Sequence, residues 1–263
     1  MKSLIYKAFI KKDLKTVFGD KIIYLPFIIL PVIFCVILPA GFIIASNFMS
    51  DASVNDNFKE IPLPEEFQSL NLREKFLYLS LNTIFPSLFL LIPIMSASII
   101  AGTGFVGEKE NKTIESILYT PVSVSEIFKA KVLSALIPSI LFTFVSFIIF
   151  FIILFIGKAL SSVEIIIPVV KWFTLVFWLS PALALLAVLF MVLVSAKAKT
   201  FQQAQQRIVY IILPLIIIGI GQISGIFILN SLVLFIAGIL IFTCNYFLFK
   251  FCEQSFVPEK LIT

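Results

Sequence analysis

The sequence contains no histidine and only three cysteines. Without histidine, the chain cannot build a Ser-His-Asp or Cys-His catalytic group, a histidine metal site or a histidine proton relay. Cys35 and Cys244 lie inside apolar stretches and Cys252 follows the last one, so their spacing fits neither a metal-ligand set nor a CxxC motif. We therefore predict that the chain has no catalytic residues, no cofactor and no metal site.

Charged residues are also scarce. Only 13% of the residues are charged and 60% are hydrophobic, with a mean hydropathy of +1.11. A soluble domain has about 25% charged and about 45–50% apolar residues. A single soluble core could not bury the 30 phenylalanines together with the many isoleucines and leucines, so lipid is the expected solvent. The net charge of +5 then favours membrane lipid with anionic headgroups as a partner, and no nucleic acid.

Stretches without any charged residue define the expected membrane spans. A helix needs about 20 residues to cross a bilayer, and five charge-free stretches reach that length. The last is long enough for two spans, which we expect to turn at Asn230-Ser231. The sequence thus predicts an all-α, polytopic integral membrane protein with one transmembrane domain over residues 1–263. Its six predicted transmembrane helices are residues 22–45, 84–106, 132–157, 172–196, 208–229 and 231–249.

Lysine and arginine are divided unevenly between the two sides of these spans. Fifteen lie in the N-terminal segment, the second and fourth connections and the tail, and five lie on the opposite side. The positive-inside rule therefore predicts a multi-pass protein of the cell (plasma) membrane with both termini cytoplasmic and residues 46–83 as an extracytoplasmic loop. Residues 1–21 place Lys7, Lys11 and Lys15 on one helical face, which predicts an amphipathic cytoplasmic helix in the membrane interface. A simple positive anchor for the first span would give the same pattern.

A glycine motif at the end of the second predicted span imitates a nucleotide-binding loop. Gly102, Gly104 and Gly107 match the GxGxxG pattern, which in a dinucleotide site follows a β-strand. Here the pattern ends a long apolar span, and Glu108 stands where a P-loop would place its lysine. We therefore interpret these glycines as sites of close helix packing at the exit from the membrane.

The segment that follows, residues 107–125, is the most informative part of the chain. Ile114, Ile117 and Leu118 form a short apolar stripe at helical spacing, flanked by charged residues. Thr120-Pro121 ends the predicted helix, and Ser123 with Glu126 predicts a capping box for the next one. A short amphipathic helix held between two spans fits either docking into a groove of another protein or lying on the membrane surface.

This segment resembles the coupling segment of the membrane subunits of type-2 ABC exporters. Residues 107–123 read GEKENKTIESILYTPVS, which is similar to the family pattern GEKExxTxExLLxTPVS. The basic lead-in at residues 11–21 and the polar turn FQQAQQ at residues 201–206 also resemble the family, although the four glutamines could simply solvate the turn. The six-span layout extends the likeness over nearly the whole chain.

The resemblance implies a permease that forms a translocation path and couples to a separate ATPase subunit. Residues 108–119 would form the coupling helix, and the expected coupling residues are Glu108, Glu110, Thr113, Ile114, Glu115, Ile117, Leu118, Thr120 and Pro121. The implied partners are two copies of an ABC ATPase, a second permease copy or a paralogue, and an exported substrate whose chemistry the sequence does not show. Two alternatives remain open: an ion-coupled secondary transporter, and a non-transporting membrane sensor or assembly factor.

Overall fold

The structure is a computed structural model that describes residues 2–48, 71–111, 113, 123–160, 165–223 and 230–255. Every regular element within these ranges is helical, and none of the described residues forms a strand. Six of the helices are long and apolar enough to cross a membrane, which confirms the predicted all-α fold with six transmembrane helices. They span Ile23–Phe48, Arg73–Glu110, Val124–Leu160, Val169–Ser195, Phe201–Gln222 and Ser231–Gln254.

The spans are built from shorter elements, some of them π-helical. The chain begins with α1 (Lys2–Gly19), which precedes the first span. The first span consists of α2 (Lys21–Val32), η1 (Ile33–Ile37) and α3 (Leu38–Phe48). The second consists of α4 (Leu72–Leu79), η3 (Ser80–Ile84), α5 (Phe85–Phe89), α6 (Leu91–Gly102), η4 (Thr103–Gly107) and α7 (Glu108–Glu110). The third is the single helix α9 (Val124–Leu160). The fourth span consists of α10 (Val169–Phe173), η5 (Thr174–Leu179) and α11 (Ser180–Ser195). The fifth consists of α12 (Phe201–Arg207) and α13 (Val209–Ile223), and the sixth is α14 (Ser231–Ser255).

Several helices extend beyond the charge-free stretches because polar residues cap them. Asn71 and Glu74 form a capping box at the start of α4, so residues 72–83 of the predicted 46–83 loop are helical and continue into the second span. Ser123 accepts a hydrogen bond from the backbone N–H of Glu126 (3.3 Å), so α9 begins well before residue 132. Asn230, in the predicted turn, precedes α14, and its Oδ1 accepts the N–H of Ser231 (2.6 Å).

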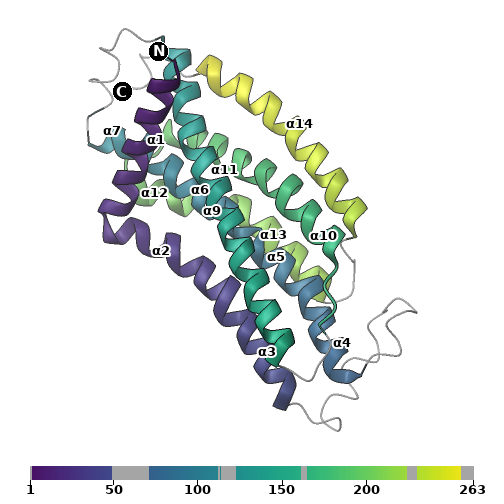
Figure 1. Ribbon diagram of the computed structural model, residues 1–263. Coiled ribbons are helices and arrows are strands. Elements are labelled where there is room, and N and C mark those ends of the chain that lie inside the picture. The colour runs from purple at the N-terminus through teal and green to yellow at the C-terminus, as the bar shows by residue number, and fades with distance from the viewer. Residues whose placement is uncertain are drawn as a thin grey trace.

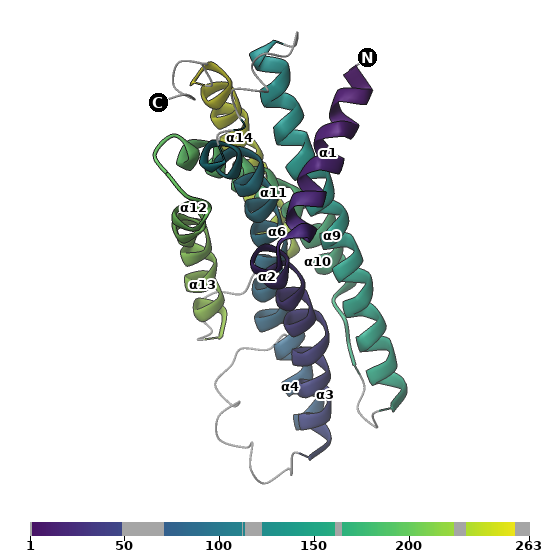
Figure 2. The same ribbon diagram turned by 90° about the vertical axis from the view of Figure 1, so that its left-hand side faces the viewer.

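The second and fourth spans form the centre of the bundle. In α6 and α11 most residues are buried, and many of them are small. Small side chains let helix backbones approach closely, which is the main source of packing between helices in lipid. The first, fifth and sixth spans lie outside this centre and expose Ile, Leu and Phe side chains that suit a hydrocarbon environment. Figures 1 and 2 show α6 and α11 running through the middle of the bundle, with α14 and the α2–α3 helix on its outside.

Among the described residues, three of the four π-helical segments end two residues before a proline. These segments are η1, η3 and η5, and the prolines are Pro39, Pro86 and Pro181. A proline has no N–H for the carbonyl four residues earlier, and a wider turn is one way for the helix to accommodate the loss. The fourth segment, η4, contains no proline and ends at Gly107, where the predicted coupling segment begins.

The two ends of the bundle can be told apart in both views. α1 and the C-terminal end of α14 lie at one end, whereas α3 and α4 lie at the other (Figures 1 and 2). α1 packs along the first part of α9, and its Val17 is completely buried by this contact, while Phe18 is exposed. The side of α1 that carries Lys11 and Lys15 is exposed, whereas the side that carries Asp13 and Val17 is buried against the protein.

Candidate functional site

The described part of the predicted coupling segment is a short continuation of the second span. α7 holds Glu108 and Glu110, and the Thr113 backbone N–H (2.9 Å) and hydroxyl (3.3 Å) both donate to the Glu108 carbonyl, which closes the end of the helix. The structure thus places three of the predicted coupling residues together. The other six lie outside the described residues: Ile114, Glu115, Ile117, Leu118, Thr120 and Pro121.

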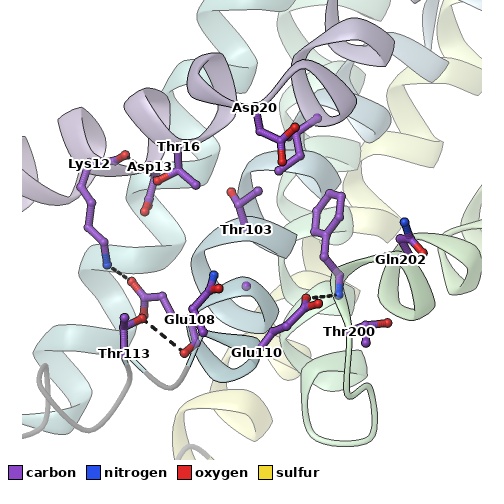
Figure 3. Close-up of a pocket in the computed structure, with 14 residues that line it drawn as sticks. Lys12, Asp13, Thr16, Asp20, Thr103, Glu108, Glu110, Thr113, Thr200 and Gln202 are labelled. Atoms are coloured by element: carbon purple, nitrogen blue, oxygen red, sulfur yellow. Dashed lines mark hydrogen bonds and ion pairs between the residues drawn. The ribbon is translucent and has the colours of Figure 1, made fainter.

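Glu108 faces the interior of the bundle. Its side chain is only 5% exposed, and its two carboxylate oxygens pair with Lys12 of α1 and Lys131 of α9 (Figure 3 shows the Lys12 contact). Lys131 is 1% exposed and also donates to the Gly104 carbonyl of η4 (2.8 Å). The family resemblance implied that Glu108 is a coupling residue, and in the structure two lysines hold its side chain inside the bundle.

A second buried carboxylate lies beside this pair. Asp13 of α1 is 3% exposed and accepts a hydrogen bond from the Ser134 hydroxyl (2.5 Å). The pKa of Asp13 is raised to about 6, mainly by burial and also by the nearby Glu108 charge, whereas the Ser134 hydrogen bond and the two lysines lower it. Asp13 is therefore the carboxyl group of this site that changes its charge just below neutral pH.

Glu110 connects the second span to α12. The Glu110 carboxylate accepts the backbone N–H of Phe201 (2.8 Å), one of the unpaired donors at the start of α12. Gly102 makes room for the Phe201 ring, because a Cβ atom there would lie 2.8 Å from Phe201 Cε2. This contact fits the interpretation that the glycines serve close packing.

One of the four glutamines in the polar turn also has a packing role. The Gln205 amide donates to the Ser98 carbonyl of α6 (3.0 Å), and its oxygen accepts from the Ser98 hydroxyl (3.4 Å). Gln202 and Gln206 are exposed, as expected for residues that only solvate a turn. The turn is thus fixed to the central helix by Gln205.

A cavity of about 530 Å³ lies between α1, α7 and α12. Among the described residues, the carboxylates of Asp13, Asp20, Glu108 and Glu110 line it together with the ammonium group of Lys12, and most of the other lining residues are polar (Figure 3). This surface suits a cationic or amide donor. Within the described ranges, no group of three or more Cys, Asp or Glu side chains is arranged to hold a metal ion.

Sequence reasoning missed four members of this site: Lys12, Asp13, Lys131 and Ser134. Their partners are 23 to 121 positions away in the chain, so no local spacing connects them. Lys131 directly precedes the charge-free stretch of the third predicted span, so it was interpreted as the end of that span and its burial was not predicted. The one available signal was the acidic Asp13 among the lysines of the N-terminal helix.

Comparison with known protein families gives one match. A family model described as ABC-2 family transporter protein matches residues 65–202, slightly more than half of the chain. The matched range holds the second to fourth spans, the predicted coupling segment and the start of α12. A search of curated proteins finds no match.

Proposed function

Because this chain belongs to the ABC-2 family of transporter proteins, we propose that it is the permease subunit of an ATP-binding-cassette exporter and couples to a separate ATPase subunit. The family makes it a membrane component of an ABC transporter, with an ABC ATPase as the implied partner. The exporter role, the coupling and the composition of the complex are our proposal.

The observation that carries the proposal is the position of the described residues that flank the coupling segment. α7 ends and α9 begins at the end of the bundle where α1 also lies, and Glu108, Glu110 and Thr113 line the acidic cavity. In the proposed complex the stripe Ile114, Ile117 and Leu118 docks on the ATPase, and exposed Glu110 faces basic or amide donors on it. Glu108 contributes from inside, because it holds the base of the segment.

We propose that two ATPase copies bind this end and that a second permease copy or a paralogue completes the path. The exposed apolar side chains of the first, fifth and sixth spans suit contacts with lipid and with that second subunit. This end, with both termini, would face the cytoplasm. ATP binding and hydrolysis in the partner would drive the permease between its inward-open and outward-open states.

The ion-coupled alternative depends on ionisable groups within the spans. The structure buries Lys131 and Lys171, but both lie near the ends of their spans and not at the middle, where ion-coupling groups are expected. This placement favours structural anchoring over ion binding. The sensor alternative differs from the exporter only in the absence of transport, so measured efflux would separate the two.

The main experiment removes the apolar stripe by the double substitution Ile114→Asp with Ile117→Asp. Burying one isoleucine contributes about 1.5–3 kcal/mol, so two aspartates should release the ATPase from the complex. The measurement is co-purification of the cognate ATPase from co-expressing cells. The control places two aspartates at exposed Ala196 and Gln206, near the same end, and should retain the ATPase. A double variant with full ATPase binding would remove the main support for the assignment.

The energy supply gives an independent test. The chain carries no credible nucleotide motif, so the purified permease alone should hydrolyse no ATP, and the co-purified complex should. Robust hydrolysis by the isolated chain would contradict the proposal.

The orientation can be tested with single cysteines in a background that lacks the three native ones. Cysteines at Asn55 and Ser162 should react with an impermeant thiol reagent in intact cells. Cysteines at Lys112 and Lys199 should react only after permeabilisation. The opposite pattern would reverse the proposed orientation.

A further inference from the structure

Four charged residues meet inside the bundle at the base of the coupling segment. This charge cluster consists of Lys12, Asp13, Glu108 and Lys131, and three of its members, all except Lys12, are at most 5% exposed. The residues come from three separate parts of the chain: α1, α7 and α9. The cluster is therefore the place where these three elements are joined by charge.

Lys131 is the centre of the cluster. Its ammonium group contacts the Glu108 carboxylate and the Gly104 carbonyl, so it holds both α7 and the π-helical segment before it. Ser134 lies one helical turn further along α9 and donates to Asp13 of α1. One face of α9 thus carries a contact to the second span and a contact to the N-terminal helix.

The Glu108–Lys131 pair also closes the coupling segment at its base. Glu108 stands at the start of residues 107–125, and Lys131 lies in the second turn of the helix that follows them. A displacement of the segment by a bound partner would therefore reach both ends at once. Loss of the Lys131 side chain would remove both this ion pair and the hydrogen bond from α9 to the Gly104 carbonyl.

Stability alone does not account for such a cluster. Apolar side chains of similar volume often replace a buried ion pair without loss of stability, because the pair must first give up its hydration. Buried charges are directional, however, and fix one relative position of the groups that they join. A device that transmits movement needs this fixed position.

We propose that Lys131 is the positioning residue that makes α1, α7 and the first part of α9 move as one body when the coupling segment is displaced. Glu108 and the Gly104 carbonyl are its contacts to the second span, and α1 joins through the Lys12–Glu108 and Ser134–Asp13 contacts beside it. This inference rests on the proposed function, since it concerns the movement that the ATPase would produce.

The test separates positioning from folding by comparing Lys131→Met with the double variant Asp13→Asn, Lys131→Met, which leaves the coupling residue Glu108 unchanged. The single variant leaves the Asp13 and Glu108 carboxylates buried with Lys12 alone, so its yield of complex should fall severalfold. The double variant removes one negative and one positive charge and leaves the Lys12–Glu108 pair intact, so it should restore the complex yield and the unfolding midpoint to near wild type. A residue with only a structural role would be fully rescued in this way.

The readout is movement at the opposite end of the bundle. Spin labels are attached at Leu160→Cys in α9 and Leu232→Cys in α14, two exposed positions, in a background without native cysteines. In the wild-type complex, ATP with vanadate should shift the distance distribution between the labels. In the double variant the complex should still hydrolyse ATP, but the shift should be lost.

The possible outcomes distinguish a failure of the positioning role of Lys131 from a failure of the proposed function. A double variant that assembles and still shows the nucleotide-dependent shift overturns the positioning role alone. A double variant that fails to assemble also overturns it, because the charges would then serve folding. A wild-type chain that binds no ATPase overturns the proposed function, and the positioning role with it.

Discussion

Each end of this bundle buries a lysine, and the two lysines are held in different ways. Lys131, at the end where α1 lies, pairs with the Glu108 carboxylate and lies near Asp13. Lys171, toward the other end, is 5% exposed, and its hydrogen-bond partner among the described residues is the Asn82 carbonyl. One lysine is balanced by charge and the other by a backbone dipole.

The partner of Lys171 has a specific origin. The Asn82 carbonyl lies four residues before Pro86, which has no N–H to donate to it. Lys171 replaces that missing donor and so repairs a local defect of the second span. The comparison indicates that a buried cation can serve one helix, as Lys171 does, or join three elements, as Lys131 does.

The largest expected effect is at Lys131. Removing one partner of a buried ion pair typically costs about 3–5 kcal/mol, so Lys131→Met should lower the unfolding midpoint of the detergent-purified chain strongly. The matched control is Lys129→Met, in the same helix. Lys129 pairs with Glu253 (2.7 Å) but is 42% exposed, and such pairs contribute about 0–1 kcal/mol. Equal losses for the two variants would show that Lys131 is not set apart by its partners.

A smaller effect is expected at Lys171. Lys171→Met leaves the Asn82 carbonyl buried without a donor, at a cost of about 1–3 kcal/mol. Pro86→Ala restores a backbone N–H to the second span, so the cost of Lys171→Met should shrink in that background. The measurement is a double-mutant cycle of unfolding midpoints. Strictly additive effects would contradict the idea that Lys171 replaces the donor lost at Pro86.

A still smaller difference should separate two neighbouring glutamines of α12. Gln205→Ala removes the hydrogen bonds to Ser98 and should cost about 1 kcal/mol. Gln202→Ala changes an exposed side chain and should stay within about 0.5 kcal/mol of wild type. If the two variants unfold alike, α12 is not fixed to α6 by Gln205.

The sequence predicted the fold well because lipid imposes simple rules. Long charge-free stretches mark helices that cross the membrane, and six such helices appear in the structure. Because spans were defined as charge-free stretches, every charged residue was interpreted as the end of a span. Lys131 and Lys171 were therefore placed at span edges, although both are buried by other helices.

The candidate site could be predicted only in part, for a physical reason. The motif around Glu108 and Glu110 is local, and a short sequence pattern can identify it. The partners of Glu108 are 96 and 23 positions away, and their proximity depends on how α1 and α9 pack. Periodicity describes the face of a single helix and contains no information about which helix covers that face.

The most specific effect depends on pH and concerns Asp13. Its pKa is raised from 3.8 to about 6, so the folded chain binds this proton more tightly than the unfolded chain does. The charged form of Asp13 therefore weakens folding above about pH 6. Stability should rise as the pH falls through 6 towards 4, by at most about 1.4 kcal/mol per pH unit. This contribution has the opposite sign to that of a carboxylate with a lowered pKa.

Asp13→Asn removes this titration but can keep the hydrogen bond, because the Asn oxygen can still accept from Ser134. At pH 7 the raised pKa, in which the attraction to Lys12 and Lys131 is already included, means that the charged carboxylate weakens folding, so the neutral variant should be more stable than the wild type. Between pH 5 and 7 the wild type should lose stability relative to the variant. The measurement is the difference in unfolding midpoint between the two chains at pH 5, 6 and 7, in which contributions from other groups cancel. Exposed Asp20→Asn controls for the loss of a carboxylate near α1. A difference that stays constant with pH would show that Asp13 does not titrate in this range.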